Sequence, residues 1–448
     1  MAALLLGNPT ARELTDQLLA PVLHPPRWIR PAMWIFGTAT LLLWVLIGYT
    51  LVTGIGVWGN NVPNAWAFAI TNFVWWIGIG HAGTFISAFL LLLGQKWRTS
   101  INRFAEGMTL FAIVQAGLFP LLHMGRAWFF YWLVPYPSTM RVWPQFRSSL
   151  TWDVAAVTTY LTVSILFWYL GLVPDLAIVR DRASSIWRRR IYGIFALGWD
   201  GSTRTWARFR IAYGLLAGIA APLVVSVHSI VSMDFAIAIL PGWHSPIFPP
   251  YFVAGAIFSG FALVLTLMIP ARALYGLENV VTEKHLDNMG KLLLTTGLVV
   301  TYAYIFESYT ARISGDRFES FIYLIGRPHG PYALAFWTVI FCNCVAPQAM
   351  WSKKCRTTPW ILWMVALFVQ IGMWLERYML IVSSLSRDRL PSSWHEYRPS
   401  LVDAGILAGT ICFFLFLFLC FLRWVPFIPI AELKQLAREK ASSPEAAT

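Results

Sequence analysis

Ten long apolar runs, separated by short polar segments, make up most of this chain. Each run is long enough to cross the ~30 Å hydrocarbon layer of a bilayer at ~1.5 Å per residue. A helix satisfies its backbone hydrogen bonds without water, so the runs predict ten transmembrane helices. The predicted spans are Met33–Val57, Ala65–Leu93, Phe104–Val134, Leu150–Val173, Ile211–Leu240, Tyr251–Leu274, Met289–Thr310, Tyr332–Trp351, Trp360–Val382 and Leu401–Trp424.

The order of the spans predicts how they pack. Spans two to five and spans six to nine both begin at the same side of the membrane, which indicates two four-helix bundles with two peripheral helices. We therefore expect an all-α, polytopic membrane protein. Its membrane domain covers residues 31–425, between an N-terminal segment, 1–30, and a C-terminal tail, 426–448. The N-terminal segment does not resemble a signal peptide, because Glu13 and Asp16 follow only a short apolar stretch.

Composition agrees with a bilayer location. The chain is 58% hydrophobic and 12% charged, whereas about 25% of residues are charged in soluble domains. None of the five cysteines belongs to a C-x-x-C pair. A disulfide framework, a zinc site or an iron–sulfur cluster held by this chain alone is therefore disfavoured.

Basic residues predict the orientation. With the N-terminus in the cytoplasm, most of the 34 Lys and Arg residues fall on the cytoplasmic side, and the segment Pro174–Arg210 is especially rich in arginine. This matches the positive-inside rule and places both termini in the cytoplasm. The net charge of +13 then reflects topology and attraction to anionic lipid, with no indication of nucleic-acid binding. Within the basic segment, Ser185–Trp199 mixes apolar and arginine residues as an interfacial helix does.

Three ionisable residues share the outer layer of the membrane in this orientation. His123, Asp153 and Asp234 lie on three consecutive spans, all within ~17 Å of an outer helix end. Arg126 follows His123 by three residues and is expected on the same helix face. Intramembrane carboxylates are costly and usually functional, although a buried His or Asp also bridges helices, and Asp153 stands where a helix cap is favourable.

This set of residues suits the oxidation of a hydroquinone, which releases two electrons and two protons. A neutral His and an ionised Asp accept hydrogen bonds from ring hydroxyls and take up their protons. No side chain here takes up electrons, so a redox centre on a partner protein is required at the same face. We expect His123, Asp153 and Asp234 to be catalytic, with Arg126 helping to bind substrate.

A second set of polar residues lies deeper and predicts a proton path. His81 is near mid-membrane on the second span, and Glu106 is at the inner edge of the third. Together with Thr84, Ser87 and Gln115 they are candidates to line it. His228 is a further candidate, which points away from Asp234 on an ideal helix. A structural role is the alternative for Glu106, because negative charge is favourable in the first turn of a helix.

Other features have structural readings or bear on partners. Bis-His haem is disfavoured, because His81 and His123 differ in depth and no C-x-x-C-H motif occurs. Two cross-helix ion pairs are expected among Glu307, Arg312, Glu376 and Arg377.

The outer loops Pro135–Ser149 and Pro241–Pro250 are rich in aromatic residues and proline. They are predicted to dock a redox partner, with a membrane-surface aromatic belt as the alternative.

At these residues the chain resembles the NrfD/PsrC family of quinone-interacting membrane subunits. The resemblance rests on Leu122–Arg126 (LHMGR), Trp152–Tyr160 (WDVAAVTTY), Phe167–Arg182 and the long stretch Ser226–Gly260. It extends over roughly 34–424, with only general similarity in spans seven to ten. Within the family, these stretches are most similar to the ten-span C subunit of bacterial alternative complex III, whose sister F subunit shares the PGWH and PPYF motifs.

The resemblance implies a quinol pocket formed by His123, Asp153 and Asp234, in a subunit of a bacterial inner-membrane complex. It further implies menaquinol rather than ubiquinol as substrate and a periplasmic iron–sulfur subunit as electron acceptor. Multihaem cytochrome c subunits and a second NrfD-like membrane subunit are the other implied partners. Iron–sulfur clusters and haems would belong to those partners, and no cofactor to this chain alone.

Two other classes of function remain open on the residues alone. A proton-linked transporter would show paired broken helices around a midplane site, and none is evident in the sequence. A passive membrane anchor would have no site of its own, which the charged outer layer argues against.

Overall fold

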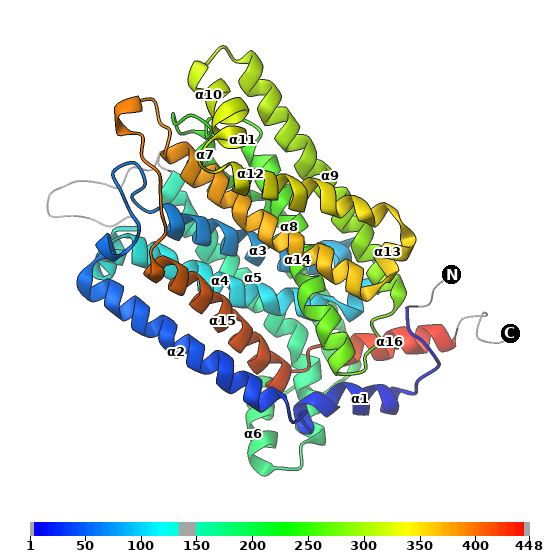
Figure 1. The fold of residues 1–448 in the computed structure, drawn as a ribbon. Helices are drawn as coiled ribbons and strands as arrows, with labels where there is room; N and C mark the ends of the chain where they lie inside the picture. Colours follow the sequence, from blue (N-terminus) through cyan, green and yellow to red (C-terminus); the bar gives the residue numbers. More distant parts are fainter. Residues whose placement is uncertain (1–3, 134–148, 443–448) are drawn as a thin grey trace.

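The computed structural model of the chain describes residues 4–133 and 149–442, and these contain helices and no strand. Ten helical segments have the length and apolar character of membrane spans, which confirms the predicted number (Figure 1). They are α2 (Ile29–Thr53), α3 (Ala67–Leu92), α4 (Asn102–His123), α5 (Ser149–Arg182), α7 (Thr203–Ala236), α8 (Phe248–Leu274), α9 (Glu283–Ile313), α12 with η5 and η6 (Ala333–Trp351), α14 with η7 (Pro359–Ser383) and α15 (Leu401–Trp424).

The spans pack as the two predicted bundles. The first consists of α3, α4, α5 and α7, and the second of α8, α9, the α12–η6 segment and α14. The bundles meet where α8 packs against α3 and α7. Helices α2 and α15 form a peripheral pair along one side of the molecule (Figure 1).

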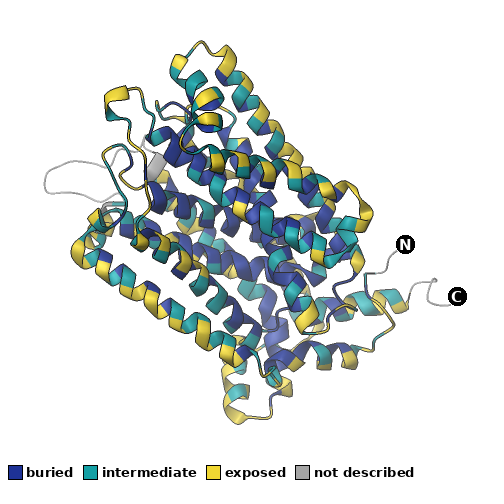
Figure 2. Cartoon of the chain, in the orientation of Figure 1, coloured by how far each residue is buried: buried dark blue, intermediate teal, exposed yellow. Residues whose placement is uncertain are grey.

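Burial follows this arrangement (Figure 2). In their most apolar stretches, 78% of the residues of α3 and of α8 are buried, against 22% for α2. Most of the exposed residues of α2 are themselves apolar, with Trp34 and Val52 among the most exposed. An apolar outer surface of this extent is what a lipid-facing helix presents, so α3 and α8 form the centre of the protein and α2 its rim.

The two ends of the bundles differ in charge and structure. At one end, called the basic end here, lie α1 (Ala11–Leu23), α6 (Ile186–Phe195), α13 (Lys353–Thr357) and α16 (Ile430–Ala441), with both described chain ends nearby (Figure 1). The other end, called the outer end, carries η1 (Ile55–Val57), η3 (Ala127–Leu133), α10 (Arg317–Phe321), α11 (Arg327–His329) and the loop 384–400. The predicted interfacial helix corresponds to α6, which exposes Trp187 and Ile194.

Some predicted span boundaries are wrong. The third span was predicted to continue to Val134, but α4 ends at His123 and a separate 3₁₀ segment, η3, follows. The cause is local, because Gly125 adopts a positive φ of 77° that an α-helix cannot contain. The fourth and fifth spans are longer than predicted at the basic end, where α5 reaches Arg182 and α7 begins at Thr203.

Candidate functional site

Two carboxyl groups meet between α5 and α7 near the outer end. Asp153 lies in the first turns of α5, and Asp234 lies in the last turn of α7, so the packing of these two helices brings them to one level. The carboxyl group of Asp153 is hydrogen-bonded to that of Asp234. Two ionised carboxylates in contact repel each other, and a shared proton removes that repulsion.

Asp153 is shielded from solvent but not fully hydrogen-bonded, whereas Asp234 is half-buried. Asp153 is 7% exposed, and its Oδ1 atom is buried without a hydrogen-bond partner among the described residues. An unsatisfied buried carboxyl oxygen costs free energy unless a ligand or water binds it. The arrangement therefore offers a hydrogen-bond acceptor to a molecule that reaches the outer end of α5.

His123 is the last residue of α4, at the same end of the bundle. Its ring centroid lies 6.3 Å from that of Trp66 and 6.4 Å from that of Phe73, so its ring contacts lead to α3 rather than to either carboxyl group. Its Nδ1 atom is buried and has no partner among the described residues. His123 is thus a second unsatisfied polar group in the outer layer, at a helix end rather than eleven residues inside the helix as predicted.

The prediction for Arg126 is wrong in its geometry. Three residues separate it from His123, but α4 has already ended and Gly125 turns the chain between them. Arg126 is exposed and not on the helix face of His123. Any contact with a ligand would have to come from this exposed position.

Deeper in the first bundle, His81 of α3 and His228 of α7 are in contact. Both are fully buried, and their Nδ1 atoms are 3.4 Å apart. The Nδ1 atom of His81 also lies 2.6 Å from the Ile77 carbonyl oxygen. Neither Nε2 atom has a partner among the described residues. The sequence placed both histidines in a candidate proton path, but did not indicate that they touch.

Below this pair, polar side chains continue along one face of α3 toward the basic end. Thr84 and Ser87 follow His81 at intervals of three residues, so they lie on successive turns. The Thr84 hydroxyl donates to Ser164 at 3.1 Å, and the Ser87 hydroxyl donates to the Glu106 Oε1 atom at 2.5 Å. We call His228, His81, Thr84, Ser87 and Glu106 the polar column.

Glu106 belongs to a buried network that the sequence analysis missed. Tyr213 donates to its Oε1 atom at 3.0 Å, and the Nε atom of Arg103 lies 3.9 Å from its Oε2 atom. Arg103 also forms an ion pair with Asp175, with 3.0 Å between Nη2 and Oδ2. Arg103 and Asp175 lie just outside the predicted spans, where charges are ordinary, so only their burial and their contact show that they belong together. Gln115, a predicted lining residue, is buried but forms no side-chain hydrogen bond within the described structure.

The ion pairs predicted in the second bundle are wrong. Glu376 pairs with its neighbour Arg377 on the same helix, with 2.6 Å between Oε1 and Nη1. Glu307 accepts a hydrogen bond from Tyr323 instead of pairing across helices with Arg377, and Arg312 is exposed. The sequence could not distinguish these partners, because Tyr323 lies in a segment outside every predicted span.

Of the two loops predicted to dock a partner, Pro135–Ser149 lies outside the described residues apart from Ser149, which begins α5. The other loop is partly internal. The Gly242 N–H donates to Glu319 at 2.9 Å, and the Trp243 indole N–H donates to the Leu380 carbonyl at 2.8 Å. Burial raises the pKa of Glu319. His244 is exposed, so part of this loop remains available for docking.

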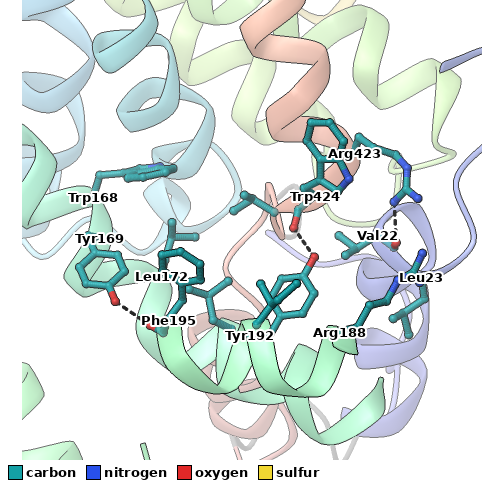
Figure 3. Close-up of a pocket in the computed structure, with 13 residues that line it drawn as sticks. Val22, Leu23, Trp168, Tyr169, Leu172, Arg188, Tyr192, Phe195, Arg423 and Trp424 are labelled. Atoms are coloured by element: carbon teal, nitrogen blue, oxygen red, sulfur yellow. Dashed lines mark hydrogen bonds between the residues drawn. The ribbon is translucent and has the colours of Figure 1, made fainter. Parts of the chain in front are cut away.

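An apolar pocket of about 440 Å³ lies at the basic end, between α1, α5, α6 and α15 (Figure 3). Two tyrosine hydroxyls hold its walls together: Tyr169 donates to the Phe195 carbonyl and Tyr192 to the Trp424 carbonyl. Arg188 and Arg423 also line it. None of the predicted site residues does, so it is separate from the carboxyl pair and the polar column.

Comparison with known proteins identifies relatives of this chain. The family model described as "Polysulphide reductase, NrfD" matches residues 56–387, well over half of the chain. A putative dimethyl sulfoxide reductase membrane subunit from Halobacterium salinarum is 28% identical over 278 residues. That alignment covers 59% of this chain and 59% of the relative, so the chain spans about three fifths of the relative's length.

Proposed function

Because this chain belongs to the polysulphide reductase NrfD family, whose members are quinone-interacting membrane subunits of reductase complexes, we propose that it binds and oxidises a quinol at Asp153 and Asp234. The observation that supports this most directly is the contact between the two carboxyl groups, together with the unsatisfied Oδ1 atom of Asp153. A quinol hydroxyl donates a hydrogen bond to such an oxygen, and an adjoining base then accepts its proton.

The proposed reaction converts the quinol to a quinone and releases two protons and two electrons. The carboxyl pair holds one shared proton, so it has capacity for one more, and we assign the second proton to His123, whose buried Nδ1 atom lies in the same outer layer. The electrons pass to an iron–sulfur centre on a partner protein at the outer end, since the described side chains of this protein include no electron acceptor. Asp153 and Asp234 both lie near the ends of their helices at the outer end, so a partner docked at that end would be close to the carboxyl pair.

In its most specific form, the proposal makes this chain the C subunit of an alternative complex III in a bacterial inner membrane. Its partners would be a periplasmic iron–sulfur subunit, multihaem cytochrome c subunits and a second NrfD-like subunit, and its substrate menaquinol. The sister F subunit is the nearest alternative. A second candidate, the membrane subunit of another reductase complex, is favoured by the name of the Halobacterium relative. Haem c absorbance in the purified native complex supports the first assignment, and its absence supports the second.

The site is tested by Asp234→Asn in the assembled complex. This change keeps the size of the side chain but removes a base, and loss of a positioned base costs about 10²–10⁴ in rate. We expect quinol oxidation to fall by that factor while the complex still assembles. Asp181→Asn is the matched control, because Asp181 is an exposed residue at the basic end of the neighbouring helix. An Asp234→Asn complex that oxidises quinol at the parent rate would falsify the assignment.

We further propose that the polar column carries protons between the outer layer and the basic end. The motivation is the position of His81, Thr84 and Ser87 on successive turns of α3, together with the contact between His81 and His228. Glu106→Gln removes its only carboxyl group, so the number of protons moved per electron in proteoliposomes is expected to fall. His81→Phe should act in the same direction, whereas the exposed Glu283→Gln should not. An unchanged proton-to-electron ratio in both column variants rules the path out.

A further inference from the structure

A second cavity of about 400 Å³ lies inside the second bundle, on the side of the outer end. Its walls come from α8, α9, the α12–η6 segment and α14, and from the segment around Tyr323. This volume is within the range of small-molecule sites, ~300–1,000 Å³. The cavity is built from other helices than the carboxyl pair, so it is a separate site.

One part of the cavity is polar and closely hydrogen-bonded. Glu307 and Glu376 both line it, with exposures of 6% and 4%. Glu307 accepts a hydrogen bond from Tyr323 at 3.2 Å, and Glu376 accepts one from Tyr304. Tyr304 also accepts a hydrogen bond from Asn343 at 2.8 Å. Two carboxyl–tyrosine pairs therefore face one space. Because both tyrosine protons are already donated, the pairs offer an occupant hydrogen-bond acceptors, and Arg327, which also lines the cavity, offers a donor.

Most of the remaining lining is apolar and continues to the outer surface of the bundle. Phe336, Val339 and Ile340 form one wall, and Ile305 stands at the edge with 64% of its surface exposed. Ile305 lies within the apolar span α9, where exposed side chains face lipid. The cavity thus opens sideways to the hydrocarbon region, which is the route by which an amphiphile with an apolar tail would enter.

Three π-helical segments surround this cavity. They are η4 (Ile322–Gly326), η5 (Ile340–Val345) and η7 (Met379–Ser383), and each contributes lining residues. A π-turn inserts one extra residue into a helix and is uncommon, and such turns occur frequently at functional sites. Three independent chain segments with the same rare feature at one cavity indicate a space shaped for an occupant.

The charged residues around the cavity limit which kinds of ligand fit it. Glu376 is paired with Arg377, and Arg327 lines the same cavity as Glu307. Each carboxyl group therefore has an arginine in its surroundings, so neither a phosphate nor a metal ion would meet an uncompensated charge. A neutral head group with hydroxyl or carbonyl oxygens fits the carboxyl–tyrosine pairs, and an apolar tail fits the opening.

We propose that this cavity binds a second membrane quinone or quinol, with its ring oxygens at Glu307 and Glu376 and its tail in the opening beside Ile305. The ligand class rests on the quinone interaction of the family, and does not depend on Asp153 and Asp234 being the site of oxidation. The proposal concerns binding, and no electron transfer is assigned to this cavity.

The test is photolabelling of the native complex in nanodiscs with a radiolabelled, photoreactive quinone, followed by peptide mapping. We expect label on the α9 or α12 peptides that line the cavity as well as in the first bundle. Thr301→Phe places a ring inside the cavity and should reduce the α9 and α12 label about tenfold or more, as loss of a buried hydrogen-bonding site does. Val299→Phe is the matched control, because Val299 is on the same helix but faces outward.

Glu307→Gln provides a second variant of nearly the same size and should also weaken the cavity label. Asp234→Asn should leave the cavity label in place, so that failure of the proposed oxidation site and failure of this proposal are distinguishable. Label confined to the first bundle in the parent complex overturns the proposal. It is also overturned if excess phospholipid displaces the cavity label while unlabelled quinone does not, or if Glu307→Gln alters only proton movement.

Discussion

At the residue scale, the central helices depend on glycines that allow unusually close contact. A Cβ atom on Gly83 of α3 would overlap the Ala105 carbonyl oxygen of α4, and one on Gly260 of α8 would overlap the Ala82 side chain. Small residues at such crossings let the backbones of membrane helices approach each other. The position of His81, beside these two contacts on α3, is therefore fixed by backbone packing on both sides.

Gly83→Ala is predicted to destabilise the protein. The obstructing atom is a backbone oxygen that cannot rotate away, and overpacking of this kind costs about 1–3 kcal/mol. The expected result is a lower midpoint of thermal unfolding in detergent. Gly117→Ala on α4 is the control, because a Cβ atom there meets nothing within 4 Å. Equal midpoints for both variants would show that the α3–α4 contact relaxes without cost.

The candidate site was predictable at this scale only in part. Asp153 and Asp234 were assigned to one layer from their distance to helix ends, and the structure shows their carboxyl groups in contact. The sequence predicts His123 well inside a longer helix, because a glycine at position 125 does not by itself show that the helix ends there. The pairing of His81 with His228 depends on how α3 and α7 are rotated against each other, and periodicity along one chain segment carries no such information.

At the element scale, α16 is anchored to the basic end by charged groups. Glu432 forms a two-pronged pair with Arg98, with both oxygens 3.0 Å from Nη2, and the Ala431 N–H donates to Asp175 at 3.0 Å. The side chain of Arg98 is only 5% exposed. The sequence predicts this segment only as part of the C-terminal tail, 426–448, because an amphipathic pattern alone does not reveal which charged groups it will contact.

Glu432→Gln is predicted to detach α16. It leaves the buried Arg98 guanidinium without its carboxylate, and removal of one member of a buried ion pair costs about 3–5 kcal/mol. Faster proteolysis of the α16 segment in sealed vesicles or nanodiscs measures the effect. Glu439→Gln is the control, because its pair with Lys96 is 42% and 64% exposed on the two side chains and contributes about 0–1 kcal/mol. Comparable protection of both variants would contradict the anchoring role of Glu432.

At the scale of the whole molecule, the two bundles follow from span order, which is why the sequence predicted them. Antiparallel neighbours joined by short connections pack together. The pairing of the two peripheral helices, α2 and α15, does not follow from span order, because they are the first and last spans. Irregular helical segments were not predictable in the same way. The π-turns at η4, η5 and η7 arise where tertiary contacts favour an extra residue in a turn, and apolar runs such as Tyr332–Trp351 show no local signal of it.

The orientation of the molecule is predicted from the asymmetry of its two ends. The basic end should face the cytoplasm, as the positive-inside rule requires. Single-cysteine variants at Lys353, in α13, and at His329, in α11, should be labelled by a membrane-impermeant maleimide from the cytoplasmic and periplasmic sides respectively. The native cysteines are first replaced to give a clean background. Labelling of position 353 from the periplasmic side would show that the orientation is the opposite of the predicted one.

The anchoring of α16 has a consequence for biogenesis. Ribosomes synthesise the segment with Arg98 long before residues 430–441 emerge, so Arg98 waits for a carboxylate partner, Glu432, that is made among the last residues. Asp175, by contrast, already has Arg103 as its ion-pair partner. A nascent chain that stalls before Ile430 leaves the Arg98 charge at the membrane surface without its carboxylate. The contact that holds α16 thereby distinguishes chains that include this helix from shorter fragments, which membrane proteases should remove.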